Sequence, residues 1–475
     1  MTRATDPTAE ALAAYEVRDA FFDEAVAPDG VPREASRSSL DALSGQDLEA
    51  ISARLAGDVE TRGVCFNSVD GTKGFVLDPV PRVVGAEEWA TLEDGLAQRV
   101  RALDAFVSDA YNDQRIVAAG IVPREAIEGC DYFEPSLRGH RTPGGSPWIG
   151  ISGLDLVRRP SGEFAVLEDN LRTPSGIAYT VAARQLCAPL LGELEPGPRP
   201  LDGLVGMLQA TLYAAAPPDA KEGDGPFSVL LTDGRANSAW YEHQWLAQLL
   251  HVPLVEPHEL EARGGRLWLR RRGERDLRPV DVVYRRSDQD RALSPMGELL
   301  LEPWKRGTLG LVNAYGNGVA DDKLMHGYVE QMVRFYLGEE PLMPSVPTYD
   351  LSRPEMLAEQ LPRLAELVVK PRAGHGGVGI VIGPHATRDE IERITAAVRA
   401  RPEDHVAQEL VALSRHPTAI GGRLEPRHVD LRPFVFHAGD RVLVLPGGLT
   451  RVAFTEGSLV VNSSQNGGAK DTWVL

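Results

Sequence analysis

The sequence is poor in cysteine and lacks the long apolar segments that cross membranes. Only three cysteines occur among 475 residues, far apart at Cys65, Cys130 and Cys187. An odd count at such wide spacing does not suit a disulfide framework or a zinc cluster, so we expect reduced thiols, most of them buried. No basic start with a following apolar stretch opens the chain, and no apolar run reaches about 18 residues. These absences favour a cytoplasmic protein with no membrane partner.

Blocks of like charge are also absent. The formal net charge is -18, and it is spread along the chain. Nucleic acids and anionic membranes attract basic surfaces, so we expect neither as the main partner. A local basic cleft on an acidic protein is still compatible with a phosphate ligand. Hydrophobic residues make up 43% and charged residues 25%, which is ordinary for a globular protein with a sizeable core.

Local patterns divide the chain into segments of different character. The N-terminal segment is polar and helical. The next holds short strands at 75–77 and 82–84 that are split by a turn at 78–81, then a long helix and a β-hairpin with its turn at 160–162. Proline and glycine cluster near 196–200 and 217–226. A strand–loop–helix–strand pattern follows, as in a parallel α/β sheet, and a strand at 281–285 is a candidate to join it. We therefore predict a mixed α/β (α+β) fold with the segments 1–62, 63–200, 220–305 and 306–475.

A glycine-rich loop stands between two apolar strands at residues 367–383, LVVKPRAGHGGVGIVIG. The first strand ends near Lys370, and the loop contains Gly374, Gly376, Gly377 and Gly379. Glycines let backbone N–H groups approach an anion closely, and a lysine at the strand end adds a compact positive charge. The pattern predicts a phosphate-binding loop.

Two other nucleotide-binding motifs fit this loop less well. Its glycines satisfy G-x-G-x-x-G, but a dinucleotide-binding fold needs a helix directly after them, whereas GIVIG is β-like. This argues against an NAD-dependent oxidoreductase. The Walker motif G-x-x-x-x-G-K-[ST] does not occur in the chain. The remaining alternative is a plain hairpin tip with a surface lysine.

A second group of polar residues lies in the predicted hairpin at residues 153–176. Asp155 lies on the first strand, Glu168 lies near the end of the second, and Asn170 follows two residues later. Residues two apart on a strand face the same side, and Asp155 is positioned to join them across the hairpin. Three oxygen ligands on one face suit Mg²⁺, and Arg172 repeats the spacing as a candidate phosphate contact. A solvated, charged hairpin end is the alternative interpretation.

Taken together, these segments resemble the ATP-grasp superfamily, and more narrowly the circularly permuted ATP-grasp proteins related to glutathionylspermidine synthetase. The motifs VLEDNLRTPSG, NAYGNGVADDK and VVKPRAGHGGVG carry the resemblance, which runs from about Val69 to the C-terminus. It implies a circularly permuted ATP-grasp fold with ATP-grasp parts at 63–200 and 306–475, and a Rossmann-like lobe at 220–305. In ordinary ATP-grasp enzymes the lysines and glycine loop precede the metal ligands. Here the order is reversed, as circular permutation predicts.

The resemblance also implies cofactors and residue roles. ATP and Mg²⁺ are the implied cofactors. The metal ligands would be Asp155, Glu168 and Asn170. The nucleotide would be held by Lys323, Lys370, the four loop glycines and an adenine hinge formed by Gln408, Glu409, Leu410 and Val411. Arg172 and Arg432 would stabilise the charge that develops during the reaction.

The reaction implied is ATP-dependent, ADP-forming ligation of a carboxylate to an amine through an acylphosphate. The substrates would be small molecules or peptides. A non-catalytic ATP-binding subunit that works with a partner enzyme is the alternative, and the intact set of lysines, glycines and acidic residues favours an active enzyme. A homo-oligomer and a separate partner enzyme are both compatible with the sequence.

Several further residues are candidates for the substrate side, although each equally suits a surface or structural role. Arginines are suited to binding a carboxylate. The candidates are Arg138, Arg141, Arg285 and Arg286 for a carboxylate, and Asn237, Glu242 and His243 for the acceptor. The glycine-rich tail NGGAKDTW is predicted either to close over a site or to pack the terminus through Trp473.

Overall fold

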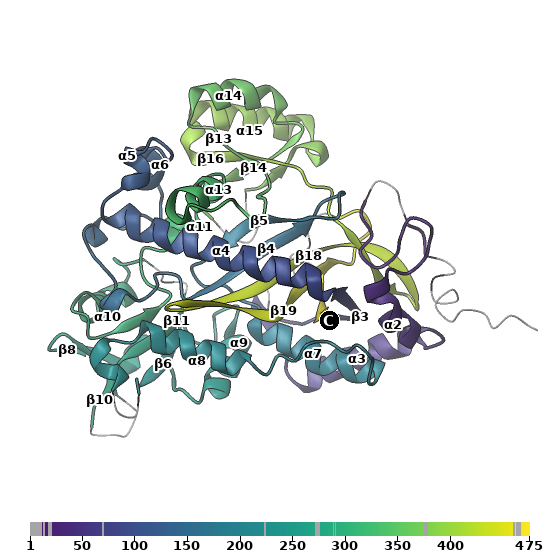
Figure 1. The fold of residues 1–475 in the computed structure, drawn as a ribbon, viewed down its shortest axis with the longest axis horizontal. Helices are drawn as coiled ribbons and strands as arrows, with labels where there is room; N and C mark the ends of the chain where they lie inside the picture. Colours follow the sequence, from purple (N-terminus) through teal and green to yellow (C-terminus); the bar gives the residue numbers. More distant parts are fainter. Residues whose placement is uncertain are drawn as a thin grey trace, which may run out of the picture.

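The computed structural model contains a large central sheet, a parallel sheet beside it and a small lobe that stands apart from both (Figure 1). It describes residues 12, 15–17, 21–68, 71–222, 225–270, 276–287, 289, 291–374, 379–458, 461 and 467–475. Across the described ranges, no helix has the length and apolar character required to cross a membrane. The mixed α/β architecture predicted from the sequence is confirmed.

The central sheet brings together strands from both halves of the chain. Its order is β3-β20-β19-β18-β4-β5, and β17 pairs with β18. Only β3 and β20 run parallel, and the other neighbours are antiparallel. The strands are β3 (Leu77–Val84), β4 (Ile151–Arg158), β5 (Phe164–Asn170), β17 (Arg415–Ile420), β18 (Arg423–Ala438), β19 (Arg441–Ala453) and β20 (Gly467–Val474).

Helices cover both faces of this sheet. Val435 packs in one hydrophobic cluster with α4 (Ala86–Tyr111), while its neighbours Phe434 and Phe436 pack in another with α7 (Ile177–Leu191) and α8 (Leu204–Ala215). Successive strand residues point to opposite faces, so α4 lies on one face and α7 and α8 on the other. The short helices α5 (Arg115–Ala118) and α6 (Arg124–Glu128) follow α4.

The second sheet is parallel and lies in the predicted Rossmann-like segment. Its order is β12-β11-β6-β7, and α9 (Trp240–Leu250) packs against it. The predicted strand at 281–285 is confirmed as β11, whereas β12 lies C-terminal to the predicted segment 220–305. The strands are β6 (Ser228–Thr232), β7 (Leu254–Val255), β11 (Val282–Arg286) and β12 (Gly310–Val312). A three-stranded sheet of β8 (Leu260–Arg263), β9 (Arg266–Leu269) and β10 (Arg278–Val280), with α10 (Pro295–Lys305), adjoins it.

The small lobe, residues 348–409, stands at the top of Figure 1. Its antiparallel sheet has the order β13-β16-β14-β15, and its core contains Leu367, Val369, Val398 and Ala407. The predicted strand–loop–strand around the glycines is confirmed, since β14 pairs with β15. The elements are β13 (Thr348–Asp350), α14 (Pro354–Gln360), β14 (Leu367–Pro371), β15 (Val381–Ile382), α15 (Arg388–Ala400) and β16 (His405–Glu409). Three short helices precede the lobe: α11 (Gly318–Asp321), α12 (Lys323–His326) and α13 (Val329–Met332).

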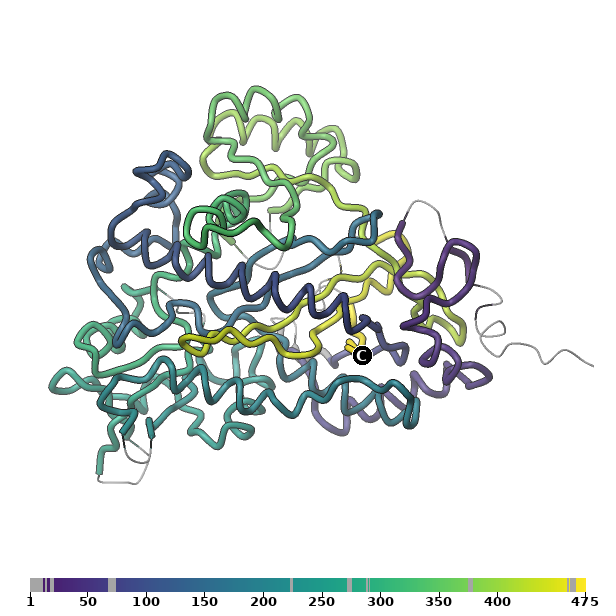
Figure 2. The backbone as a smooth tube through the Cα atoms, in the orientation of Figure 1, coloured from purple at the N-terminus to yellow at the C-terminus, as the bar shows by residue number. Residues whose placement is uncertain are grey.

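The described N-terminal segment and the C-terminal strand β20 meet at one edge of the central sheet. Figure 2 shows the yellow C-terminal strands beside the purple N-terminal part. The N-terminal helices α2 (Glu34–Leu43) and α3 (Leu48–Thr61) pack on β3, and a small hairpin of β1 (Cys65–Ser68) and β2 (Gly71–Gly74) follows them. Trp473 lies in one hydrophobic cluster with Leu40 and Val80. The helical character predicted for the N-terminal segment is thus confirmed for α2 and α3.

Two local expectations from the sequence were wrong or only partly right. The turn predicted at 78–81 does not form, because β3 runs through both prolines as an edge strand, where missing N–H groups are tolerated, and a register shift of β20 accommodates them. The described part of the glycine-rich tail does not close over a site. It forms β20 inside the sheet, and the alternative of packing through the buried Trp473 is confirmed.

Candidate functional site

The β4–β5 hairpin places its polar residues on one face. Asp155 lies directly opposite Glu168, and Gly153 lies opposite Asn170. Opposite residues in an antiparallel pair have adjacent side chains, so these three polar residues share a face as the sequence predicted. The register shifts after Asp155, because Leu156 pairs with Val166 and Leu167 is the extra residue of a bulge. Asp169 faces the other side, where Arg99 of α4 donates to both its oxygens at 2.6 and 2.7 Å.

Asp155 is held by two arginines. Arg432 donates from Nε and Nη2 to its two oxygens at 2.6 and 2.9 Å, and Arg451 donates from Nη2 at 2.8 Å. Burial alone would raise the pKa of Asp155, but the Arg432 and Arg451 guanidiniums reverse this effect and lower the pKa to about 2. The carboxylate therefore stays ionised. Arg451 also binds Asp430. Sequence reasoning missed Arg451, because only the pairing of distant strands brings it to Asp155.

Arg172 and Arg432 both lie beside the loop 173–175. Arg432 Nη1 donates to the Ser175 carbonyl at 3.3 Å. Arg172 lies over the Tyr132 ring at 4.0 Å and donates to Asp321 Oδ1 at 3.1 Å. Asp321 also accepts the backbone N–H of Arg172. The structure therefore places both predicted arginines near the end of the hairpin, with Arg172 held by Asp321.

The two predicted lysines approach the hairpin from different elements. Lys323 opens α12, and its Nζ lies 3.4 Å from Glu168 Oε1 and donates to the Gly374 carbonyl at 2.8 Å. Lys370 lies on β14 and is buried. Burial lowers the pKa of its ammonium, and the charge of Glu168 opposes this shift. Lys323 thus contacts both the hairpin and the glycine loop.

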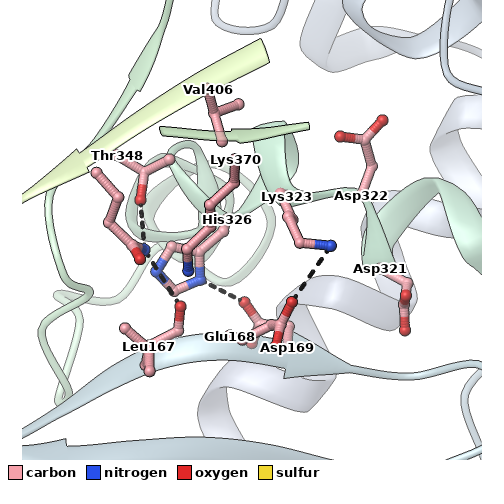
Figure 3. Close-up of a pocket in the computed structure, with 11 residues that line it drawn as sticks. Leu167, Glu168, Asp169, Asp321, Asp322, Lys323, His326, Thr348, Lys370 and Val406 are labelled. Atoms are coloured by element: carbon pink, nitrogen blue, oxygen red, sulfur yellow. Dashed lines mark hydrogen bonds and ion pairs between the residues drawn. The ribbon is translucent and has the colours of Figure 1, made fainter. Parts of the chain in front are cut away.

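A small cavity lies between the end of the hairpin and the small lobe (Figure 3). Its volume is about 10 Å³, which is room for about one water molecule. Four of the predicted site residues meet here: Glu168, Lys323, Lys370 and Gln408. The lining residues are Leu167, Glu168, Asp169, Asp321, Asp322, Lys323, His326, Thr348, Lys370, Val406 and Gln408.

The start of the glycine loop adjoins this cavity. Gly374 and Gly379 have φ of +114° and +77°, a conformation that favours glycine. Arg372 fixes the backbone ahead of the loop, because Nη2 donates to Asp322 Oδ2 at 2.8 Å and to the Ala126 carbonyl at 2.7 Å. The predicted residues Gly376 and Gly377 lie outside the described ranges.

The predicted adenine hinge reaches the cavity through one side chain. Gln408 Nε2 donates to Thr348 Oγ1 at 2.8 Å and to the Leu167 carbonyl at 3.2 Å, so it bridges the small lobe and the hairpin. Glu409 instead accepts from Tyr349 and Arg363. Leu410 and Val411 follow the end of β16 and do not line the cavity.

Arg286 and Glu242 act as supports for the loop after the hairpin. They form a buried ion pair at 2.9 Å. Arg286 Nη1 donates to the Pro174 carbonyl at 2.6 Å, and Glu242 Oε2 accepts the Gly176 N–H at 2.8 Å. Both groups therefore fix loop 173–176, which in turn contacts Arg432 through Ser175.

The other substrate-side candidates lie away from the cavity. Arg285 donates to the Asn313 carbonyl at 2.7 Å inside the protein. His243 contacts Thr232 Oγ1 at 2.8 Å, and burial together with Arg286 lowers its pKa to about 2, so it is neutral. Asn237 Oδ1 accepts the N–H of Ala239, Arg138 pairs with Glu128 at 3.0 Å, and Arg141 is exposed.

The motif NAYGNGVADDK contains supports that sequence reasoning did not assign. Asn313 Oδ1 accepts the N–H groups of Gly150 and Ile151 at 2.8 and 2.7 Å, and its Nδ2 donates to the Leu171 carbonyl at 2.5 Å. Asn317 Nδ2 donates to the same carbonyl at 2.6 Å. These amides fix the start of β4 to the segment after β5. The motif that contains Lys323 also contains both asparagines, so it could have indicated their role, although sequence reasoning assigned a role to Lys323 alone.

The polar side chains of the hairpin could supply only part of the coordination shell of a hard cation. Among the described residues, no group of three or more histidines, cysteines, aspartates and glutamates forms a metal site. The candidate set has two carboxylates and one amide. The buried Asn170 Nδ2 has no hydrogen-bond partner within the described ranges, so the protein does not bind this end of the amide. These donors fit Mg²⁺ if phosphate oxygens and water complete its shell.

Comparison with known proteins identifies the family of the chain. The profile of the family described as "Circularly permuted ATP-grasp type 2" matches residues 81–453. An uncharacterized protein of Synechocystis sp. is 42% identical, over 96% of this chain and 97% of its own length. A provisionally named glutamate–cysteine ligase 2-3 of Frankia alni is 44% identical over 96% of this chain, which spans only 54% of that relative.

A solved structure resembles the fold. It is a glutathione synthetase-like effector from Globodera pallida in its apo form, with a TM-score of 0.58 over 90% of this chain and 98% of that one. Its sequence identity is 13%, so the likeness concerns the fold alone.

Proposed function

The chain belongs to the circularly permuted ATP-grasp type 2 family, and we propose that it is a Mg²⁺-dependent, ADP-forming ligase that joins a carboxylate to an amine through an acylphosphate. The family and the names of the Frankia relatives support an ATP-dependent ligase in general. The carboxylate–amine chemistry, the acylphosphate and the residue roles are the finer parts of the proposal.

The observation that carries the proposal is the double contact of Lys323. Its ammonium lies 3.4 Å from Glu168 on the hairpin and donates to Gly374 at the start of the glycine loop. Lys370 lines the same cavity from β14. Two cations between a carboxylate face and a glycine loop form a site for an anion that also carries a divalent cation. A nucleotide triphosphate with Mg²⁺ fits this description.

Asp155, Glu168 and Asn170 would hold Mg²⁺ in this proposal. When bound, the ion would neutralise phosphate charge and orient the phosphates. Asp155 stays ionised because Arg432 and Arg451 lower its pKa to about 2, with burial opposing them. Lys323 and Lys370 would bind phosphate oxygens, and Arg172 and Arg432 would face the charge that develops on the transferred group.

Entry of the nucleotide requires the small lobe to move. The cavity of about 10 Å³ is far smaller than a nucleotide. Gln408 joins the lobe to Leu167 of the hairpin, and Lys323 of α12 joins Gly374 of the lobe while it contacts Glu168 of the hairpin. We expect a nucleotide to replace these contacts, so that Lys323 exchanges the Gly374 carbonyl for a phosphate. No covalent enzyme group is needed, because alignment and charge neutralisation supply the catalysis.

The acceptor substrate would bind near the carboxyl ends of the parallel strands. Ligands of open α/β sheets bind there. Asp233 follows β6 and Ser287 follows β11, and Ser287 Oγ donates to Asp233 Oδ1 at 2.6 Å. Arg286, at the end of β11, contacts loop 173–176, which contacts Arg432. This edge is therefore linked to Arg432 through loop 173–176.

A non-catalytic ATP-binding role beside a partner enzyme is the second candidate. The observation that favours it is the length of the Frankia relative, of which this chain spans 54%. A further region accompanies the shared part in that protein. The same fact is compatible with an active ligase whose partner acts on the same substrate.

The test is ADP release from ATP and Mg²⁺, scanned over amino acids, polyamines and peptides. We expect turnover with one carboxylate and amine pair, and loss of Mg²⁺-dependent turnover by about 10²-fold or more in Glu168→Gln without loss of folding. Glu163→Gln is the matched control, because Glu163 is an exposed residue at the other end of the same hairpin. Tight ATP binding with no turnover on any pair would favour the second candidate, and unchanged turnover in Glu168→Gln would refute the metal assignment.

A further inference from the structure

His326 lines the cavity with an imidazole nitrogen that the protein does not use. It lies on α12, three residues after Lys323, and is 4% exposed. Its Nε2 has no hydrogen-bond partner among the residues described. Figure 3 shows the ring among the lining side chains, with one nitrogen bonded to Asp169. A buried, unpaired nitrogen on a cavity wall is costly unless a ligand satisfies it.

The other nitrogen indicates which tautomer the ring adopts. His326 Nδ1 lies 2.8 Å from Asp169 Oδ2 and 3.1 Å from Arg99 Nη2. A carboxylate only accepts and a guanidinium only donates, so the two compete for Nδ1. The contact with the carboxylate is shorter, and it is charge-assisted when Nδ1 carries the hydrogen. Nε2 of this cavity-lining residue then carries the lone pair.

The charge state of the ring is consistent with this assignment. Burial lowers the pKa of His326, and the hydrogen bond to Asp169 opposes the shift. A neutral imidazole with its hydrogen on Nδ1 is a hydrogen-bond acceptor at Nε2 and has no charge with which to bind phosphate.

Several lining residues are uncharged, namely Leu167, Thr348, Val406 and Gln408. The side chains of Leu167 and Val406 are apolar. Gln408 has committed its amide hydrogens to Thr348 and to the Leu167 carbonyl. In Figure 3, Leu167 and Thr348 lie on one side of the cavity and Lys323 and Asp322 on the other. A nucleoside suits the first side, and phosphates suit the side that carries Lys323.

We propose that His326 Nε2 accepts a hydrogen bond from the nucleoside part of the bound nucleotide, from either the adenine amino group or a ribose hydroxyl, and so contributes to nucleotide selectivity. This inference rests on the proposed function, because it requires a nucleotide in the cavity. It assigns His326 a binding role that neither the phosphate loop nor the metal ligands imply.

The experiment measures the binding of four nucleotides to the full chain by calorimetry in the presence of Mg²⁺. The probes are ATP, purine riboside triphosphate, 2′-deoxy-ATP and 3′-deoxy-ATP. The wild type should bind one analogue about three- to tenfold more weakly than ATP, and His326→Phe should abolish that difference by weakening ATP alone. Loss of the penalty for purine riboside triphosphate identifies the amino group as the donor, and loss for a deoxy analogue identifies the hydroxyl.

Two variants serve as controls. His326→Gln keeps an acceptor on the side chain and should retain part of the preference. His437→Phe makes the same change at another buried imidazole, outside the cavity lining, whose Nδ1 has no hydrogen-bond partner among the described residues and lies 4.0 Å from Asp104 Oδ1. It should leave all four affinities unchanged.

A measurement on the wild type keeps the test decisive if His326→Phe does not fold. In ¹⁵N spectra of the histidine rings, with His326 assigned from the Gln variant, Nε2 should be unprotonated and should shift when ATP binds. Protonated Nε2 in the free protein, or equal analogue penalties in wild type and His326→Phe, would overturn the inference. Failure of the wild type to bind ATP at all would overturn it together with the proposed function, whereas ATP binding with unchanged selectivity would overturn the inference alone.

Discussion

Two groups of buried charges lie on the same central sheet, and they differ in how completely the protein satisfies them. Where β3 meets β20, Lys470 binds Asp78 and donates to the Pro417 carbonyl at 2.9 Å, while Asp78 accepts the N–H groups of Val80 and Ala419 at 3.0 and 2.7 Å. Both side chains are 0% exposed. This closed cluster has no room for a ligand.

The hairpin cluster at the other end of the sheet is open. The Glu168 side chain is 32% exposed and only loosely paired with Lys323 at 3.4 Å. Asn170 Nδ2 has no partner among the described residues. The comparison teaches that buried charge does not by itself mark a functional site. Hydrogen-bonding capacity that the protein leaves unused is the better indicator.

The largest expected effect is on stability, in the closed cluster. Lys470→Met leaves the Asp78 carboxylate buried without its cation, which costs about 3–5 kcal/mol. Urea unfolding would measure this loss, and the double variant Asp78→Asn, Lys470→Met should recover much of it. A loss of unfolding free energy below about 1 kcal/mol would show that the Asp78–Lys470 pair does not stabilise the fold as proposed.

The corresponding change in the open cluster should affect binding and turnover rather than stability. Lys370→Ala removes a cation from the cavity wall, and we expect ATP-dependent turnover to fall by about 10²-fold or more. The urea midpoint of this variant should stay close to that of the wild type. Burial already disfavours the charged form of Lys370, so removing the ammonium costs little stability. Full activity in Lys370→Ala would refute the assignment of the phosphate loop.

The smallest of these effects concerns pH and Glu24, which belongs to another closed cluster. Arg82 Nε donates to Glu24 at 2.6 Å. Burial raises the pKa of Glu24, but Arg82 and then Arg158 outweigh it and lower the pKa from 4.5 to about 2. A lowered folded-state pKa means that the ionised form stabilises the protein above pH 4.5, and that this contribution is lost as the pH falls toward 2.

This contribution amounts to about 3 kcal/mol at neutral pH. The difference in unfolding free energy between wild type and Glu24→Gln should therefore shrink steadily between pH 5 and pH 3. A difference that stays constant over this range would contradict the assigned pKa shift. ATP binding at pH 7 should be the same in both proteins, because Glu24 lies outside the cavity lining.

Features with a local cause were predictable from the sequence. The hairpin formed as expected, because alternation within two short strands and the turn at 160–162 depend on neighbouring residues. The strand–loop–strand around Lys370 formed for the same reason. The shared face of Asp155, Glu168 and Asn170 followed directly from this local geometry.

Features that depend on distant strands were not predictable. Nothing near Arg451 in the sequence indicates Asp155, which lies 296 positions away in the chain. The turn expected at 78–81 disappeared because β20, from the other end of the chain, pairs with this edge. The order of strand pairing depends on burial of the whole sheet, which no local sequence pattern records.

The sequence by itself determined the types of group available for the chemistry: two lysines, a glycine loop, and carboxylates with an amide at a strand end. The tertiary structure decided which of them meet, because contacts between Lys323, Glu168 and Gly374 require the small lobe to lie on the hairpin. It also decided which buried groups remain unsatisfied. Burial and hydrogen bonding are properties of the packed molecule. Only the fold therefore distinguishes Lys470, which binds Asp78 and the Pro417 carbonyl, from His326, whose Nε2 has no hydrogen-bond partner among the described residues.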